Sequence, residues 1–327
     1  MEQRTFPRLG RQAGVVGLGA WQLGADWGTV SEDDAMAVLD AAVEAGVTFL
    51  DTADVYGDGR SEQLIGRFRA ARPDTALTVA TKMGRRVPQT PEAYTLDNFR
   101  AWTDRSRANL GVDTLDLVQL HCPPTVVFAD DAVFDALDTL VEEKRIAAYG
   151  VSVETCDEAL TAIARPGVAS VQIILNALRH KPLERVLPAA ANAGVGIIAR
   201  VPLASGLLSG RYDEHTTFAA DDHRSYNRHG EAFDVGETFS GVDFTTGLAA
   251  VRRLAPLVGD DRTMAQFALR WVLDQPGVTV VIPGARDAAQ ARANVAAADQ
   301  PPLSTSELAE VASVYDELIR PQVHHRW

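Results

Sequence analysis

The stretch that decides the fold is VTFLDTADVYGDGRSEQLIG, residues 47–66. The run VTFL leads straight into Asp51, so a predicted buried strand ends in a carboxylate. Five positions later a single tyrosine, Tyr56, stands in a short loop marked by glycines. Such a pattern is either a strand edge with a polar turn or part of a functional site, and the rest of the chain has to decide between them.

Short β-branched runs of the same kind recur along the chain. They are continuous and not alternating, which is typical of strands covered on both faces in a parallel sheet. Counting the run above, the eight predicted strands are residues 14–19, 47–51, 76–82, 115–121, 146–152, 169–175, 195–201 and 278–284.

Helical patterns lie between these strands. Residues 31–46 show an apolar stripe, with Ser31 suited to cap the helix start and Gly46 to stop it. Residues 95–111 repeat the scheme. Eight strands that alternate with helices favour a single α/β domain over residues 1–327, a (β/α)8 TIM barrel, with a doubly wound sheet as the alternative.

Two segments depart from this rhythm. Residues 4–14, RTFPRLGRQAG, carry proline and glycine turn signals before the first strand and predict a small hairpin or cap at the bottom of the barrel. Residues 203–243 follow the seventh strand without clear periodicity. A compact domain rarely keeps so long an irregular loop unless it covers a site, so we expect this loop to act as a lid. The C-terminal HHRW is expected to be frayed.

Composition excludes several classes of function. The formal net charge of −13 argues against nucleic acid or an anionic membrane as a main partner. Cys122 and Cys156 are too few for a disulfide framework or a structural zinc site, and no metal site is predicted. The first residues lack the apolar core of a signal peptide, and no stretch approaches the roughly 20 apolar residues of a membrane helix. We therefore expect a cytoplasmic protein, and the sequence gives no indication of its oligomeric state.

Polar side chains stand where three successive strands end. Asp51 ends the second strand, Lys82 the third and His121 the fourth, while Tyr56 follows the second. Function in a barrel sits at the carboxyl ends of the strands, and neighbouring strands lie about 4.8 Å apart. Taken singly, each residue would be an ordinary turn, surface or structural residue. Their order on successive strand ends predicts one hydrogen-bonded cluster.

The four side chains suit acid catalysis. A free phenol titrates near pH 10 and is a slow proton donor at neutrality unless a neighbour favours its phenolate. Lys82 would do so, Asp51 would keep that lysine charged, and His121 would orient the carbonyl oxygen that receives the proton. General acid catalysis of this kind is worth about 10²–10⁴-fold.

The motifs DTADVYGDGRSEQLIG, ATK and LVQLH, on successive strand ends, resemble the aldo-keto reductase superfamily. The resemblance extends from GVVGLGAWQLG near the start to VIPGARDAAQARAN near the end. In that family an aspartate, a tyrosine, a lysine and a histidine form the catalytic tetrad, and the tyrosine donates the proton to a carbonyl. The resemblance implies these roles for Asp51, Tyr56, Lys82 and His121. We expect Trp21, Tyr56 and His121 to line the substrate pocket, Trp21 as an aromatic wall.

The resemblance also implies a nicotinamide cofactor, NADPH or NADP+, extended across the barrel top. No G-x-G-x-x-G opens a helix after a strand, so a Rossmann crevice is not predicted. The expected cofactor contacts are Gly19, Ala20, Trp21, Asp51, Ser152, Gln172, Arg200, Leu203, Ser205, Gly206, Arg211, Gly284, Arg286, Gln290 and Asn294.

Different parts of the cofactor are assigned to different segments by the resemblance. Ser152 and Gln172 match the residues that hold the carboxamide, and the segment PLASGLLSGR matches the loop around the pyrophosphate. Arg286, beside a predicted helix start near Asp287, matches the clamp on the adenosine 2′-phosphate and favours NADPH over NADH.

Three positions depart from the family pattern. Val153 replaces a common asparagine, and Ala293 replaces a common glutamate. Arg200 stands where well-known members stack a tyrosine on the nicotinamide ring. A planar guanidinium can stack on a ring, but its charge would disfavour the oxidised, cationic nicotinamide relative to the reduced one.

The leading hypothesis is an NADPH-dependent reductase of an aldehyde or ketone. A dehydrogenase working in the alcohol-oxidising direction, and a nicotinamide-binding regulatory or redox-sensing subunit with little turnover, stay as alternatives. A metal-dependent hydrolase is disfavoured because no His-x-His or carboxylate cluster marks the strand ends. An aldolase is disfavoured because Asp51 would keep Lys82 charged. The polar loop 203–243 favours a hydroxylated or charged carbonyl substrate, with Trp27 as a further candidate wall of the pocket.

Overall fold

The computed structural model describes residues 1–24 and 30–327, so Trp27 lies outside the described residues. Within them, eight parallel strands form one sheet whose spatial order follows the chain. The strands are β3 (Leu18–Gly19), β4 (Phe49–Asp51), β5 (Thr78–Met83), β6 (Leu117–His121), β7 (Tyr149–Ser152), β8 (Val168–Ile174), β9 (Gly196–Arg200) and β10 (Val278–Val281). Bridges from Val16 to Val281 and from Gly19 to Gly284 join the first strand to the last. The predicted (β/α)8 barrel is confirmed.

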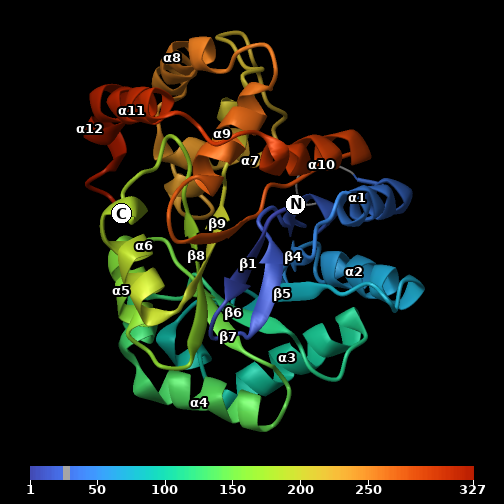
Figure 1. Ribbon diagram of the computed structural model, residues 1–327. Coiled ribbons are helices and arrows are strands. Elements are labelled where there is room, and N and C mark those ends of the chain that lie inside the picture. Colours follow the sequence, from blue (N-terminus) through green and yellow to red (C-terminus); the bar gives the residue numbers. More distant parts are fainter. Residues whose placement is uncertain (25–29) are drawn as a thin grey trace.

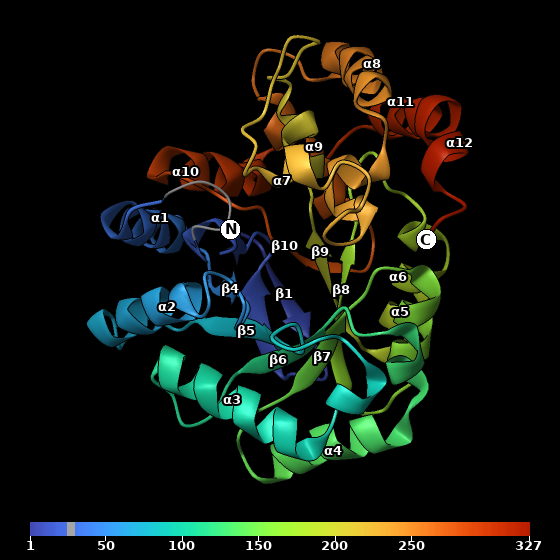
Figure 2. The ribbon, with the colours of Figure 1, turned by 180° about the vertical axis from the view of Figure 1, so that it is seen from behind.

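Helices lie around the outside of the strands (Figures 1 and 2). Those between the strands are α1 (Glu32–Glu44), α2 (Arg60–Ala71), α3 (Leu96–Leu110), α4 (Asp131–Glu142), α5 (Cys156–Ile163), α6 (Pro182–Ala193), α7 (His223–Tyr226), α8 (Phe244–Leu254) and α9 (Met264–Leu273). Those after the last strand are α10 (Ala288–Val295), α11 (Thr305–Val314) and α12 (Arg320–Val323). The predicted cap of α1 is confirmed, because the Ser31 side chain accepts the backbone N–H of Asp34. At the start of α3, the Thr95 side chain accepts the backbone N–H of Asn98 in the same way. Gly111, at φ +66°, ends α3 in the left-handed region.

The N-terminal hairpin closes the amino-terminal mouth of the barrel. Strands β1 (Gln3–Phe6) and β2 (Arg11–Gly14) pair antiparallel, as predicted. Phe6 is fully buried, and its ring stacks on that of Phe49 at 5.4 Å. A Cβ added at Gly196 would lie 2.1 Å from the Phe6 ring, so only glycine at this position leaves room for the Phe6 side chain.

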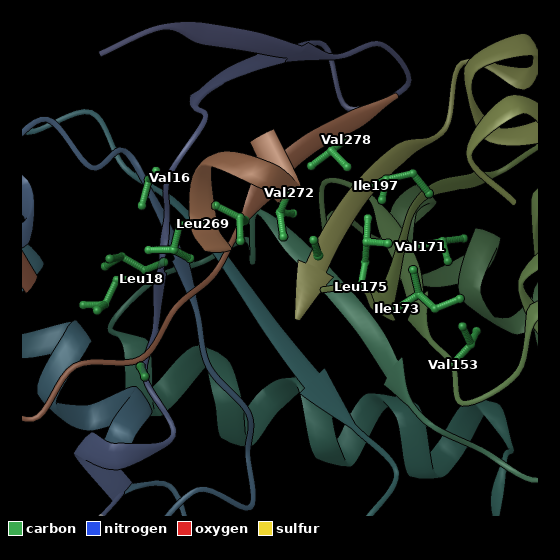
Figure 3. Close-up of a cluster of buried hydrophobic side chains, with 14 of the residues drawn as sticks. Val16, Leu18, Val153, Val171, Ile173, Leu175, Ile197, Leu269, Val272 and Val278 are labelled. Carbon is green, nitrogen blue, oxygen red and sulfur yellow. The ribbon is translucent and has the colours of Figure 1, made fainter. Parts of the chain in front are cut away.

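The main hydrophobic core lies between the strands and the helices that surround them. Figure 3 shows part of it, with Val171 and Ile197 from the sheet and Val272 from α9. Because the strands are covered on the helix side by this core and on the inner side by the barrel filling, their sequences read as continuous apolar runs.

Residues 203–243 contain only short helical turns, among them η4 (Ala204–Ser209), η5 (Val235–Glu237) and η6 (Phe239–Gly241). After them, α8 and α11 pack together on one side of the molecule (Figure 2). The chain then ends at Trp327, which is buried against the η5–η6 segment.

The predicted frayed C-terminus is wrong. The Trp327 side chain is only 6% exposed, and its indole N–H donates to Asp234 Oδ1 at 3.1 Å. The guanidinium of Arg179 lies 3.6 Å from the centre of the Trp327 ring. A terminus stays ordered when its side chains are tied down in this way, and apolar burial, a cation–π contact and a hydrogen bond act together here.

Candidate active site

Lys82 lies at the centre of a buried hydrogen-bonded cluster at the carboxyl ends of β4, β5 and β6. Its Nζ donates to Asp51 Oδ1 at 2.5 Å, to the Thr52 carbonyl at 2.8 Å and to the Tyr56 hydroxyl at 3.2 Å. The His121 ring meets the Tyr56 ring edge to face, with centroids 5.9 Å apart. The structure therefore brings together the four residues that the sequence order pointed to.

Local backbone contacts hold Tyr56 in place. Its N–H donates to the Ala53 carbonyl at 3.1 Å, and its own carbonyl accepts the Ser61 N–H at 3.2 Å. Gly57, at φ +58°, packs so closely that a Cβ there would lie 2.1 Å from the Gly24 carbonyl oxygen. The glycine after the tyrosine is thus required by both conformation and space. This explains why the loop is short and marked by glycine.

The Asp51 carboxylate is held from both sides. Opposite Lys82, its Oδ2 accepts the amide N–H groups of Gln172 at 2.7 Å and Gln119 at 3.3 Å. Gln172 is predicted to hold the carboxamide of the cofactor, and in the structure its amide nitrogen also donates to Asp51. Gln119 was missed by sequence reasoning, although its place two residues before His121 puts it on the same side of β6.

Lys82 is charged despite its burial. Burial lowers the pKa of Lys82, but the negative charge of Asp51 and the oxygen of Tyr56 outweigh it, so the pKa lies above its ordinary value. Burial raises the pKa of Tyr56, and the opposing effect of Lys82 does not cancel this. The charge of Lys82 is predicted to favour the phenolate. Lys82 does act in that direction, but the phenol keeps its proton because burial wins, and it is therefore a proton donor.

His121 is a neutral imidazole. Burial is the main reason that its pKa lies well below the ordinary value, and the positive charges of Arg85, Lys82 and Arg200 act in the same direction. Among the described residues, nothing hydrogen-bonds its buried Nδ1. A neutral ring beside the Tyr56 hydroxyl can donate one N–H to a substrate oxygen.

Trp21 borders the Tyr56 side of the site. Its ring stacks on Tyr56 with centroids 6.2 Å apart and lies 5.2 Å from the ring of His223 in the long loop. Phe233 from the same loop meets Trp21 edge to face at 6.2 Å. The long loop therefore reaches the predicted substrate pocket. Ala20, beside Trp21, donates its N–H to the Asp51 carbonyl at 2.8 Å.

Arg200 ends β9 and is almost fully buried. Its Nη2 donates to Glu154 Oε2 and to the Val153 carbonyl, both at 2.9 Å, and its Nη1 pairs with Glu237. Burial lowers the pKa of Arg200, but Glu237 and Glu154 hold it well above the ordinary value. Glu154 and Glu237 were missed by sequence reasoning. Glu154 follows the strand end at Ser152 by two residues, whereas Glu237 lies in a loop without any periodic signal.

Ser152 ends β7, two residues before Glu154. In the sheet it pairs with Gln172 of β8, and its hydroxyl accepts a hydrogen bond from the Cys122 thiol at 3.4 Å. Burial raises the pKa of the Cys122 thiol to about 12. A thiol in that state is a poor nucleophile.

Two of the segments assigned to the cofactor, one at Gly19 and one that begins at Gly284, meet at the seam between β10 and β3. The Gly19 N–H donates to the Pro283 carbonyl at 3.0 Å, next to Gly284. Asp287 caps α10, while the Gln290 side chain accepts the Arg286 N–H at 3.0 Å and the Asn294 amide donates to the Gly284 carbonyl at 3.1 Å.

The loop after β9 supplies the remaining assigned contacts. Ser205 and Gly206 both have positive φ, and the Ser205 hydroxyl donates to the Glu237 carbonyl at 2.8 Å. Leu203 is half-buried, and Arg211 is exposed, as is Arg286. Exposed cations and polar strand ends form a donor set that suits an anionic nicotinamide dinucleotide.

Residues 1–24 and 30–327 contain no group of three or more His, Cys, Asp or Glu side chains placed to hold a metal ion. None of their helices is long and apolar enough to cross a membrane.

Comparisons with known proteins show which proteins this chain resembles in sequence and fold. Aldo-keto reductase YhdN of Bacillus subtilis (strain 168) is 28% identical over 297 residues, which cover 90% of this chain and 87% of that protein. The glycerol dehydrogenase AKR11B4 from Gluconobacter oxydans superposes with a TM-score of 0.79 at 29% identity, over 97% of this chain and 96% of that one. An aldo-keto reductase from Klebsiella pneumoniae in complex with NADPH shares the fold, with a TM-score of 0.72 at 22% identity over 96% and 95% of the two chains.

A model of the Aldo/keto reductase family matches residues 15–316. That span runs from just before β3 to just after α11 and contains every residue of the cluster around Lys82. The chain therefore belongs to the Aldo/keto reductase family of oxidoreductases.

Proposed function

We propose that this protein reduces an aldehyde or ketone to an alcohol with NADPH, and that Tyr56 donates the proton. The observation that carries the proposal is the hydrogen bond from Lys82 Nζ to the Tyr56 hydroxyl at 3.2 Å, made by a lysine that Asp51 keeps charged. This arrangement stabilises the phenolate that is left after the proton has moved to the substrate.

The other residues have distinct roles. His121 donates an N–H to the carbonyl oxygen and, with the Tyr56 hydroxyl, polarises the carbonyl without a metal. Asp51 positions Lys82 and is positioned in turn by Gln172. When bound, NADPH supplies the hydride to the carbonyl carbon. Trp21 and the long loop shield the reacting atoms from water.

Cofactor binding is assigned to the strand ends and to the seam between β10 and β3. Ser152 and Gln172 hold the nicotinamide carboxamide, Arg211 lies near the pyrophosphate, and Arg286 contacts the 2′-phosphate. The exposed cations support this assignment, as does the NADPH found in the Klebsiella pneumoniae protein. The chain accordingly prefers NADPH to NADH.

A second candidate is the reverse reaction, oxidation of an alcohol by NADP+. The name of the Gluconobacter oxydans relative, a glycerol dehydrogenase, favours it. Both directions use the same residues, because Tyr56 then accepts the proton that it donates in reduction.

The experiment that tests the proposal measures NADPH oxidation with a panel of aldehydes and ketones, and NADP+ reduction with polyols. Tyr56→Phe removes only the hydroxyl and is expected to lower kcat by about 10²-fold or more, while the dissociation constant of NADPH changes little. Tyr149→Phe is the matched control, since this buried tyrosine donates to Asp138 at 2.7 Å from the start of β7, at the opposite end of the barrel. Equal turnover in Tyr56→Phe and wild type would rule out the assigned role.

A further inference from the structure

Two arginines and two glutamates form a compact group beside the active site, which we call the charge cluster: Arg85, Glu154, Arg200 and Glu237. Glu154 lies between the two cations, with its Oε1 3.6 Å from Arg85 Nη2 and its Oε2 2.9 Å from Arg200 Nη2. Glu237 pairs with the other terminal nitrogen of Arg200. Two positive charges are thus balanced by two negative charges. Two further charges, Arg179 and Asp234, interact electrostatically with Glu154, and they too are of opposite sign.

The charge cluster borders the atoms that react. Arg85 donates its Nε–H to the His121 carbonyl at 3.2 Å. The charge of Arg200 lowers the pKa of His121, and the charge of Glu237 raises that of Tyr56, so both are within electrostatic reach of the pair that holds the substrate oxygen. A hydride donor has to approach the carbonyl carbon to about 3–3.5 Å. The nicotinamide ring must therefore lie within reach of the same charges.

The charge of that ring changes in the reaction. It is positive in NADP+ and neutral in NADPH, so a lone guanidinium beside it would weaken binding of the oxidised form only. One uncompensated charge a few ångströms away changes a binding constant by about tenfold or more at the dielectric of a protein site. Arg200 alone would thus bias the protein towards NADPH and would retain the reduced cofactor.

We propose that Glu237 sets the relative affinity for the two oxidation states of the cofactor, because it neutralises Arg200 where the nicotinamide binds. The inference rests on the proposed function, since it requires a nicotinamide at this site. Glu154 cannot perform this role alone because it is shared with Arg85. Glu237 is the carboxylate in the cluster that pairs with Arg200 at Nη1.

The position of Glu237 is fixed by the loop that carries it. Its carbonyl accepts the Ser205 hydroxyl at 2.8 Å, which ties it to the loop assigned to the pyrophosphate. Three residues before Glu237, Asp234 caps the start of η5 and accepts the N–H of the Trp327 indole, which anchors this side of the segment. The carboxylate is therefore held in place before the cofactor arrives, and the irregular loop has a chemical task besides covering the pocket.

The test compares the dissociation constants of NADPH and NADP+, measured by fluorescence titration and calorimetry. Glu237→Gln is expected to weaken NADP+ by about tenfold relative to NADPH, with the NADPH affinity nearly unchanged. Arg200→Gln is expected to move the ratio the other way, and the double variant to return it towards that of wild type. Glu231→Gln is the matched control, because this exposed glutamate lies in the same loop and its carboxylate accepts the His229 N–H.

The outcomes separate this inference from the proposed function. If wild type binds both cofactors and Glu237→Gln leaves their ratio unchanged, the inference is overturned and the reductase assignment stands. An equal loss of both affinities would show that Glu237 only supports the loop, which also overturns the inference. If wild type binds neither form, the proposed function itself fails. If Glu237→Gln does not fold, Arg200→Gln provides the test, and an unchanged ratio of the NADPH and NADP+ affinities in that variant overturns the inference.

Discussion

Replacement of Lys82 by methionine tests the ion pair on which the catalytic cluster depends. The variant keeps most of the side-chain volume but leaves the Asp51 carboxylate in the interior, where Asp51 is 3% exposed, with two amide donors and no cation. Removal of one partner from a buried pair costs about 3–5 kcal/mol. We expect a loss of that size in the free energy of unfolding, measured by urea denaturation followed by circular dichroism.

The double variant Lys82→Met/Asp51→Asn separates stability from chemistry. A buried pair replaced by neutral groups of similar volume is often no less stable than the original, so the double variant should recover most of the lost free energy. Neither variant should recover turnover, because the Tyr56 phenolate has lost its cation, and we expect kcat at least about 10²-fold below wild type.

Lys144→Met is the control, since Lys144 is exposed and should change stability by less than about 0.5 kcal/mol. The reasoning is refuted if Lys82→Met costs less than about 1 kcal/mol, or if the double variant is no more stable than the single one.

Three further predictions concern other parts of the chain. Burial, with a smaller effect from Glu62, raises the pKa of Asp54 from 3.8 to about 7. Between these pH values the folded state holds a proton that the unfolded state releases. The free energy of unfolding therefore falls as pH rises from about 4 to 7. Asp54→Asn should remove this loss and stabilise the protein by several kcal/mol at pH 8 but hardly at pH 4, as measured by urea denaturation at both pH values. Trp327→Ala should cost about 3–5 kcal/mol and expose residues 234–241 to hydrogen exchange, which mass spectrometry would detect. Arg286→Ala should weaken NADPH by about tenfold and leave NADH unchanged in parallel titrations, because only NADPH carries the 2′-phosphate.

Each of these has a clear contrary result. A pH profile of stability that is parallel in wild type and Asp54→Asn would show that Asp54 is not protonated in the folded protein. His325→Ala, at an exposed position in the same tail, should not alter exchange in residues 234–241, and equal effects of the two tail variants would disprove the anchoring role of Trp327. A parallel loss of NADPH and NADH affinity in Arg286→Ala would exclude a contact specific to the 2′-phosphate.

Much of the fold could be predicted because buried parallel strands leave a direct record in the sequence. The run before Asp51 and its seven counterparts are continuous because both faces of each strand are covered. The proximity of Asp51, Tyr56, Lys82 and His121 could be predicted because their order follows three successive strand ends, and parallel strands bring such ends together.

What escaped prediction depends on contacts between segments far apart in the chain. Glu237 meets Arg200 through a loop without periodicity, and Trp327 is ordered by Arg179 and Asp234, to which no local pattern connects it. The net direction of the pKa shift of Tyr56 could not be predicted from the sequence either, because it depends on how far burial outweighs the charge of Lys82.

The most direct test of the central claim is a fluorescence titration of the purified wild-type protein with NADPH and, in parallel, with NADH. Trp21 lies against Tyr56, so a nicotinamide bound at this site should quench tryptophan fluorescence. The account predicts saturable quenching by NADPH at low concentration and much weaker binding of NADH. If neither nucleotide binds, a nicotinamide-dependent reaction at this site is contradicted.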